Sequence, residues 1–527
     1  MPPLPETAAV DLFVRRVRDV QADFARTDEN APAITELCAR LDGLPLALEL
    51  AARRIKTYGA VEALLAALAP ALPELTGGPR DAPARQRTMR AAIAWSYGLL
   101  DDDERSLFRR LAVCRGGCAI DAAQALATDR TAVAPALENL VAHRMLLHTD
   151  GPRDEARVGM LETMREYGLE RLAEAGEEGD ARRRHARQYL AFGEAAAPHM
   201  LEADQGVWLA RLDREHDNLR AALAWAIDSD EAEVALRLAA ALWRYWEIHG
   251  HIGEGRRWLD RALTQADGVV PAVHARALYA AARLATLQVD RTAAEDLHRR
   301  SYDLYAGSGD RLGQADVLNS WGGLVHGQGE DFARALDLHA QAFGLYAELG
   351  HRLGMADALY NQGLVRVLQW DFAGARAPLE QALTMLDDLG DRRGIVQSSL
   401  CLGITLLFVP DLPAALAMFR RVLALAEPVG DRANISYGLD GVAAAIGVQG
   451  EWECSARLFG TADHIRRDIH FPLPPSYLSL RETAVEAVRG TAPPDAFAAA
   501  YAIGEVQPLR ASIVQAMGAS HSEGRVE

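Results

Sequence analysis

Phosphate chemistry can be judged first, because this 527-residue chain has a single lysine, Lys56. A phosphate-binding loop needs a glycine-rich turn whose backbone N–H groups cradle phosphates, a lysine for the β and γ oxygens, and a Ser or Thr for Mg²⁺. Lys56 lies in the helical pattern of 53–57, with no glycine run and no apolar strand ending in paired acidic residues before it. The chain as it stands therefore lacks the residues for ATP hydrolysis by this mechanism.

Other reactive residues are few and isolated. Cys114 and Cys118 are separated by three residues, but no second Cys or His pair lies nearby at zinc spacing. His249 and His251 flank a glycine at an expected turn, and no Gly-x-Ser-x-Gly elbow is present. We therefore predict no catalytic residue, no metal site and no cofactor of the chain's own, and we expect that it is not an enzyme.

Charge and cysteine content restrict the partners and the compartment. The chain has 56 basic and 73 acidic residues, a formal net charge of −17, which repels nucleic-acid phosphates and anionic membranes at long range. Five scattered cysteines suit a reducing compartment. No secretory signal or long apolar run is visible. We expect a cytoplasmic protein that does not contact membranes.

A repeat of about 40 residues is the strongest pattern in the second half of the chain. A Gly-Asp-Arg or Gly-His-Arg corner recurs at steps of 41, 40 and 40 residues, and an aspartate-led segment recurs at steps of 40. In addition, a glycine stands 12 residues before an alanine in three successive units. The members are Gly309, Gly350, Gly390 and Gly430 of the corners, Asp331, Asp371 and Asp411 of the second series, and the pairs Gly323/Ala335, Gly363/Ala375 and Gly403/Ala415.

Such a period is typical of stacked helical hairpins. An amphipathic helix pair cannot bury both of its faces alone, so similar pairs stack, with small residues where helices cross closely. The Gly and Ala offsets resemble a tetratricopeptide pattern that is lengthened to 40 residues. We expect an all-α chain whose repeats, about six pairs over 233–468, form a tetratricopeptide-like α-solenoid.

Residues 88–163 predict a winged helix, which is a set of short helices followed by a two-stranded hairpin. The acidic run Asp101–Glu104 suits a helix N-terminus. Over 89–174 there are 11 arginines and 14 acidic residues, and the expected recognition helix offers only His143 and Arg144 against Glu138. This is a poor phosphate surface, so we predict a spacer rather than a DNA reader. The expected helices are 89–100, 105–113, 120–127 and 132–147, and the expected strands are 145–149 and 157–161.

Several ordered motifs resemble one family. Residues 41–52, Leu-Asp-Gly-Leu-Pro-Leu-Ala-Leu-Glu-Leu-Ala-Ala, resemble the GLPLA motif in the helical lid of STAND-type (NB-ARC-like) NTPases. The whole set is most similar to large actinobacterial regulators of the LuxR or SARP type, which combine an effector domain, an NTPase, a winged helix and a tetratricopeptide sensor. The further motifs are 88–97, 107–111 and 160–167, which resemble the family's winged helix, and 217–223 and 254–259, which resemble the start of its helical repeats.

The resemblance implies a nucleotide lid. Gly43, Leu44 and Pro45 would close over an adenine nucleotide, with Pro45 near the base. The family's phosphate-reading histidine corresponds to Leu161, which cannot donate a hydrogen bond, so direct phosphate sensing there is not expected. The chain begins about where the family's P-loop core would end. ADP or ATP is therefore expected only if such a core lies upstream or in a partner.

The resemblance and the repeat together predict five segments and three alternative functions. The favoured function is a non-catalytic regulator or scaffold that recognises a protein, a peptide or a small effector on the concave face of the solenoid. The first alternative is the C-terminal part of an ATP-dependent STAND transcriptional regulator, and the second is DNA binding through the winged helix. The segments are a lid remnant (1–77), a winged helix (78–175), a helical linker (176–232), the repeats (233–468) and capping helices (469–527) with a disordered tail from Gly518.

Overall fold

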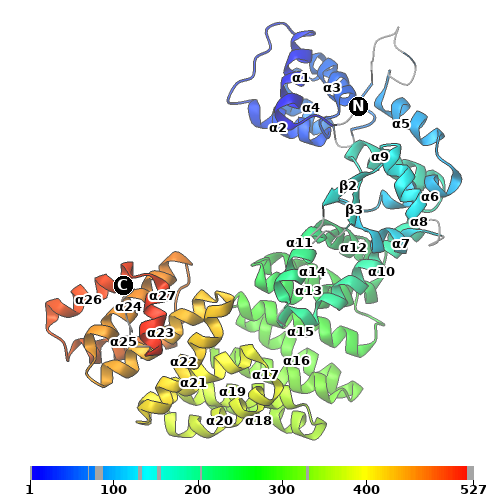
Figure 1. The fold of residues 1–527 in the computed structure, drawn as a ribbon. Coiled ribbons are helices and arrows are strands. Elements are labelled where there is room, and N and C mark those ends of the chain that lie inside the picture. Colours follow the sequence, from blue (N-terminus) through cyan, green and yellow to red (C-terminus); the bar gives the residue numbers. More distant parts are fainter. Residues whose placement is uncertain are drawn as a thin grey trace. The chain divides into compact units, whose positions relative to one another are not determined.

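The structure is a computed structural model that describes residues 3–68, 71–76, 83, 87–128, 133–150, 156–201, 204–327 and 331–518. It divides into two compact units, Met1–Val273 and His274–Glu527. Helices dominate both units (Figure 1), so the predicted all-α class is confirmed. None of the helices in the described ranges combines the length and the hydropathy that crossing a bilayer requires.

The first unit begins with four short helices that bury one apolar face each. Pro45 starts the third helix, where its missing N–H costs no hydrogen bond, and Gly59 ends that helix with a left-handed φ of 76°. The N-terminal segment crosses this group, because the N–H of Leu4 donates to the carbonyl of Gly43 at 3.0 Å. The four helices are α1 (Glu6–Arg18), α2 (Ala31–Arg40), α3 (Pro45–Tyr58) and α4 (Val61–Ala67).

The predicted winged helix follows. Asp101 and Glu104 form a reciprocal capping box at the start of α6, as the acidic run indicated. The strands were predicted within two residues, but the sheet has a third strand, β1, and its order is β1-β3-β2, all antiparallel. The turn predicted over 150–154 lies almost entirely outside the described residues. The elements are α5 (Met89–Gly98), α6 (Asp102–Leu111), β1 (Cys118–Ala119), α7 (Ile120–Leu126), α8 (Val133–Ala142), β2 (Leu147–Asp150), β3 (Ala156–Gly159) and α9 (Glu162–Glu174).

The helix predicted over 132–147 was too long. It ends at Ala142, and Arg144 takes a left-handed φ of 55°. Met145 and Leu146 are then buried as the chain turns into β2. Their apolar character continued the helical pattern of α8, although their burial belongs to the sheet.

The rest of the first unit consists of longer helices. Trp243, Tyr245 and Trp246 of α13 are buried, so aromatic side chains fill much of this core. The elements are α10 (Glu178–Ala196), the 3-10 turn η3 (Pro198–Leu201), α11 (Gln205–Arg214), α12 (His216–Asp228), α13 (Ala232–Ile248) and α14 (Ile252–Leu263).

In the second unit the 40-residue corners have a common physical basis. Each corner glycine takes a left-handed φ of 64–74° and ends a helix. The next residue is the N-cap of the following helix, and in three corners its side chain accepts a capping hydrogen bond, as Asp310 does from the N–H of Gly313 at 2.9 Å. Asp391, the N-cap residue of the third corner, makes no such bond. In three corners the arginine pairs with an acidic residue at the end of the next second helix, as Arg352 does with Asp388 at 2.7 Å, whereas Arg392 donates to the backbone carbonyl of Leu425. Every corner therefore stops one helix and starts the next, and neighbouring helices pack in sequence order (Figure 1).

The small residues lie where helices cross, with one change of register. A Cβ on Gly363 would stand 2.5 Å from Cγ of Leu379, and one on Gly403 would stand 2.7 Å from the ring of Phe419. In the preceding unit the close position is Gly322, against His339, and not Gly323, which has open space beside it. The 41-residue step between the first two corners accounts for this difference. The prediction for Gly323 was therefore wrong by one residue.

Three further helices follow the last repeat pair. α23 contacts α25 and α27, and α24 contacts α25, α26 and α27. The predicted tail lies, apart from Gly518, outside the described residues. The remaining elements are α15 (Pro271–Leu287), whose first three residues belong to the first unit, and then α16 (Arg291–Ser308), α17 (Arg311–Gly327), α18 (Phe332–Leu349), α19 (Arg352–Leu368), α20 (Phe372–Leu389), α21 (Arg392–Phe408), α22 (Leu412–Ala426), the 3-10 turn η4 (Glu427–Val429), α23 (Arg432–Val448), α24 (Trp452–Asp468), α25 (Pro475–Arg489), α26 (Pro494–Val506) and α27 (Leu509–Met517).

Candidate functional site

The predicted lid residues form the turn between α2 and α3. Gly43 has a φ of 60°, and a Cβ there would stand 2.6 Å from the carbonyl oxygen of Leu4, so glycine is required for two reasons. Gly43, Leu44 and Pro45 are all buried. The turn is thus packed against the chain's own N-terminal segment.

This turn meets the start of α9, where Leu161 is the N-cap residue. The carboxylate of Asp42 accepts a hydrogen bond of 2.8 Å from the N–H of Glu162. From the other side, the carboxylate of Glu166 accepts hydrogen bonds of 2.9 Å from the N–H groups of Ala71 and Leu72. The structure therefore brings the lid turn and Leu161 together.

The same contact weighs against a nucleotide phosphate at this turn. A helix N-terminus would receive a phosphate through its free N–H groups, but here the first turn of α9 already donates to the Asp42 carboxylate. Leu161 supplies no donor, and an ionised Asp42 would repel an anion. Because these residues do not fit a phosphate, no nucleotide-dependent step is derived from them, and the role of Gly43, Leu44 and Pro45 in a nucleotide lid stays a prediction.

The winged helix is tied to the linker by a buried polar network. Arg157 of β3 forms an ion pair with Glu215, and both residues are at least 95% buried. Glu215 also accepts hydrogen bonds from the Tyr189 hydroxyl at 2.6 Å and from the Asn218 amide at 2.8 Å. Asn218 in turn accepts from the N–H of Arg115 at 2.7 Å. The charge of Arg157, one of the few basic residues of the hairpin, is therefore neutralised inside the protein.

A cavity lies between the last two repeat pairs and α25. Its volume is about 150 Å³, and most of its wall is apolar. Asp440, Tyr477 and Arg481 supply a polar edge. At the mouth, Val448 is 64% exposed. The other lining residues are Ile404, Leu407, Phe408, Phe419, Gly441, Ala444, Phe459, Leu480, Thr483, Ala484 and Ala487.

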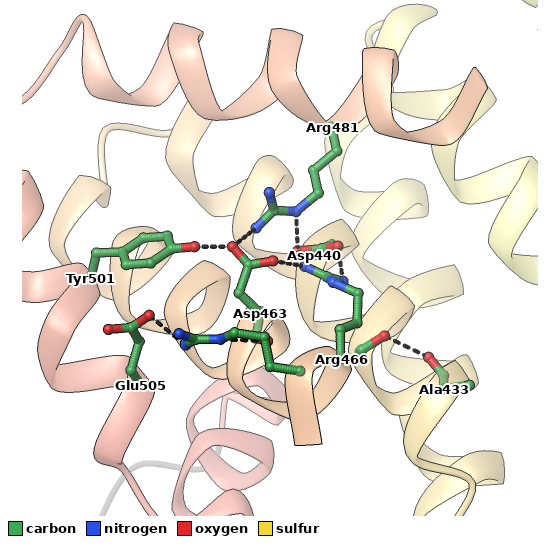
Figure 2. Close-up of polar contacts among 9 residues, drawn as sticks. Ala433, Asp440, Asp463, Arg466, Arg481, Tyr501 and Glu505 are labelled. Carbon is green, nitrogen blue, oxygen red and sulfur yellow. Dashed lines mark hydrogen bonds and ion pairs between the residues drawn. The ribbon is translucent and has the colours of Figure 1, made fainter. Parts of the chain in front are cut away.

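A cluster of two aspartates and two arginines stands at the polar edge (Figure 2). Asp440 of α23 accepts from Arg466 of α24 at 2.7 Å and from Arg481 of α25 at 3.0 Å. Asp463 accepts from Arg466 at 2.5 Å and from the hydroxyl of Tyr501, and it lies 3.0 Å from Arg481. The cluster balances two negative and two positive charges, and it fixes α25 above α23 and α24.

The charges of this cluster are stabilised by one another. Burial works against the guanidinium of Arg466, but Asp440 and Asp463 outweigh it and hold its pKa above the ordinary value. Burial and then the charge of Asp440 raise the pKa of Tyr477 well above that of a free tyrosine. At neutral pH, Tyr477 is therefore a protonated hydrogen-bond donor.

Sequence reasoning missed this cavity and its polar residues. The available signal was Asp440, the only charged residue between Arg432 and Glu451 in a helix that is buried on nearly all sides. A charge in such a position has to find a buried partner. Nothing in the pattern identified Arg466 and Arg481 as those partners.

Cys114 and Cys118 are both buried, with their thiols side by side. His249 lies 3.5 Å from Asp213. In the part of the chain that the structure describes, no group of three or more His, Cys, Asp and Glu side chains is arranged to hold a metal ion.

A family model and two mycobacterial proteins match parts of this chain. A family model described as a winged helix-turn-helix domain matches residues 100–173. A Mycobacterium tuberculosis protein provisionally named as an HTH-type transcriptional regulator is 38% identical over 286 residues, 53% of this chain and 32% of that protein. An uncharacterized protein of the same organism is 38% identical over 182 residues, 34% of this chain and 46% of that protein. The matched part thus spans less than half the length of either relative.

Solved structures show weaker similarity. A STAND protein with a tetratricopeptide repeat sensor from Pyrococcus horikoshii has a TM-score of 0.47 and 12% identity, covering 98% of this chain and 74% of that one. The apo form of RapI has a TM-score of 0.42 and 12% identity, covering 54% of this chain and all of that one. At these scores the similarities do not establish a shared fold.

Proposed function

We propose that the chain is the sensing part of a transcriptional regulator, which recognises an effector in its helical repeats and catalyses no reaction itself. The observation that carries the proposal is the cavity between α21, α23 and α25, where an apolar wall meets a buried set of charged residues. Pockets of this composition, mainly apolar with a few placed polar groups, are typical of ligand sites. The effector could instead be a protein or peptide that binds to the first helices of the repeats.

The winged-helix match and the provisional name of the mycobacterial relative support the regulatory part of the proposal. Because the chain matches only about a third of that relative, the activity of the whole regulator is itself part of the proposal. In this account the protein works in the cytoplasm. An ATP-driven version would need a P-loop core from outside the present sequence.

We propose that the winged helix couples segments of the regulator rather than reading DNA. In α8 the exposed residues include Glu138 and no arginine. Arg144 follows the helix, while Arg157 is buried against Glu215. A surface with so few cations offers little attraction to DNA phosphates. DNA binding through this domain remains the alternative, supported by the description of its family model.

The proposal is tested by blocking the cavity in the cells that make the protein. Ala484→Phe places a ring in the cavity from the half-buried face of α25, and Ser479→Phe places the same ring on an exposed position of α25 outside the cavity. We expect Ala484→Phe to change the transcripts that deletion of the gene changes, and Ser479→Phe to leave them at wild-type levels. If deletion of the gene changes no transcript, the protein is not a regulator and the proposal is wrong.

The DNA alternative has its own test. Fluorescence anisotropy of the purified chain with labelled duplex DNA at 50 and 200 mM salt measures both affinity and its salt dependence. We expect no binding at micromolar protein. A dissociation constant that weakens by a factor of ten or more between the two salt concentrations would instead support DNA binding by the winged helix.

A further inference from the structure

The size of the cavity limits what it can hold. An apolar cavity of about 150 Å³ in another protein accommodates benzene. The present cavity has about this volume, and it opens to solvent beside Val448. It therefore suits one six-membered ring, with room for a short substituent towards the open side.

The polar edge of the cavity carries hydrogen-bond donors that lack a partner among the described residues. Both carboxylate oxygens of Asp440 are engaged by arginines. Arg481, whose side chain is only 10% exposed, keeps one nitrogen, Nη2, without a hydrogen bond among the described residues, although it lies at ion-pair distance from Asp463. The hydroxyl of Tyr477 has no acceptor among the described residues either. A ligand that satisfies this edge must therefore bring an acceptor.

The charge balance of the edge favours a neutral acceptor. Two aspartates already neutralise Arg466 and Arg481. A carboxylate on the ligand would add an uncompensated negative charge close to Asp440 and Asp463, in a site where water cannot fully solvate it. A ketone, amide or phenol oxygen accepts hydrogen bonds without this cost.

We propose that the cavity between α21, α23 and α25 binds a small neutral molecule with an apolar ring and one hydrogen-bond acceptor, which receives a hydrogen bond from Arg481 or Tyr477. Such a molecule would be the effector of the function proposed above, and its role in the cell rests on that function. Binding itself is a property of the purified chain.

The test uses three probes of similar size: acetophenone, toluene and benzoate. Ligand-observed NMR titrations of the full chain at pH 7.5 should give a dissociation constant of about 1 mM or tighter for acetophenone. We expect toluene to bind about 3- to 10-fold more weakly, the usual effect of one hydrogen bond, and benzoate to bind more weakly than acetophenone. Ala484→Phe should abolish acetophenone binding, and Ser479→Phe should preserve it.

The hydrogen bond is tested separately. Tyr477→Phe and Arg481→Lys, which keeps a positive charge beside Asp440 and Asp463, should each be titrated with acetophenone and with toluene. At least one of them should remove the advantage of acetophenone while leaving toluene binding unchanged.

Three results would overturn the inference: no binding of acetophenone to the wild-type chain, equal binding by the Ala484→Phe chain, or tighter binding of benzoate. Binding of N-acetyl-phenylalanine amide in place of acetophenone would show a peptide site. Absent probe binding combined with the transcript changes described above would refute only the ligand class. Probe binding without any transcript change would refute the regulatory function and leave the ligand site standing.

Discussion

Asp440 and Arg466 form a buried ion pair of 2.7 Å that joins the two helices of the last repeat pair. Arg481 adds a third helix, α25, to the same carboxylate at 3.0 Å. Because α25 forms one wall of the cavity, the contacts of Arg481 with Asp440 and Asp463 join that wall to the last repeat pair (Figure 2). The stability of the pair and the existence of the cavity are therefore linked.

Replacing Asp440 should loosen α25. Asp440→Asn leaves Asp463 as the one carboxylate for the two guanidinium groups of Arg466 and Arg481, and we expect this to cost up to about 3–5 kcal/mol of stability in the last repeat pair. Hydrogen–deuterium exchange over Pro475–Arg489 measures the effect as lost protection. The matched control is Asp468→Asn, which removes an exposed ion pair with Arg432 and should cost about 0–1 kcal/mol. Unchanged protection of α25 in Asp440→Asn would contradict this role.

The repeat register predicts opposite effects for two glycines. Gly363→Arg places a side chain where Leu379 already packs, so it should separate α19 from α20 and lower both the helicity and the melting temperature of the chain. Gly323→Arg introduces the same residue where nothing lies within 4 Å of the added Cβ, and its melting temperature should stay near that of the wild type. Circular dichroism during heating distinguishes the two. Equal melting of both variants would mean that the assigned register is wrong.

The buried carboxyl group of Asp42 should make the stability of the protein depend on pH. Burial raises the pKa of Asp42 from its ordinary value near 4 to about 6. A carboxyl whose pKa is raised on folding binds its proton more tightly in the folded state, so its contribution to stability is present below about pH 4 and is lost as the pH rises through 6. Asp42→Asn keeps an acceptor and tolerates the φ of 53°. We expect this variant to be more stable than the wild type at pH 7.5, by up to about 3 kcal/mol.

This difference should vanish by pH 4, where Asp42 is itself mostly protonated. Exchange protection in the first turn of α9, measured at pH 4 and pH 7.5, follows the contact directly. Asp42→Ala, which removes the acceptor, should lose protection at both pH values. A gain of stability in Asp42→Asn that is the same at both pH values would show that ionisation of Asp42 is not its cause.

The buried ion pair of Arg157 and Glu215 predicts that a second substitution restores stability that the first one removes. Arg157→Met leaves the buried Glu215 with only neutral partners, and the loss should be about 3–5 kcal/mol in the winged helix and linker. Adding Glu215→Gln removes the stranded charge and should restore much of that stability. Urea unfolding of the single and double variants measures the coupling. Additive effects of the two substitutions would mean that the two side chains do not interact.

Local features of the fold could be predicted from the sequence, because each depends on neighbouring residues. The corners at Gly309, Gly350, Gly390 and Gly430 end one helix with a left-handed residue, and in three of them the side chain of the next residue caps the following helix. The acidic start of α6 is of the same kind. The prediction of Gly323 relied on its distance from the following aspartate-led segment. The close position instead lies 13 residues after the corner glycine, at Gly322.

The cavity could not be predicted in this way. Its walls come from residues 404 to 487, and α25 lies outside the repeat, so no periodic pattern indicates how it packs. Arg481 lies on a helix with few buried residues and reads as a surface charge. Only the packing of three helices turns Arg481 and Asp440 into the edge of a binding site. The link between Asp42 and α9 is also a tertiary contact, spanning 120 residues.

Native mass spectrometry of the protein isolated from its own cells tests the sensing role most directly. We predict that the wild-type chain and Ser479→Phe each carry a small molecule at one copy per chain, and that Ala484→Phe carries none. The same small-molecule mass on Ala484→Phe, or its absence from the wild-type chain, would contradict the assignment of the α21–α25 cavity as the sensor site.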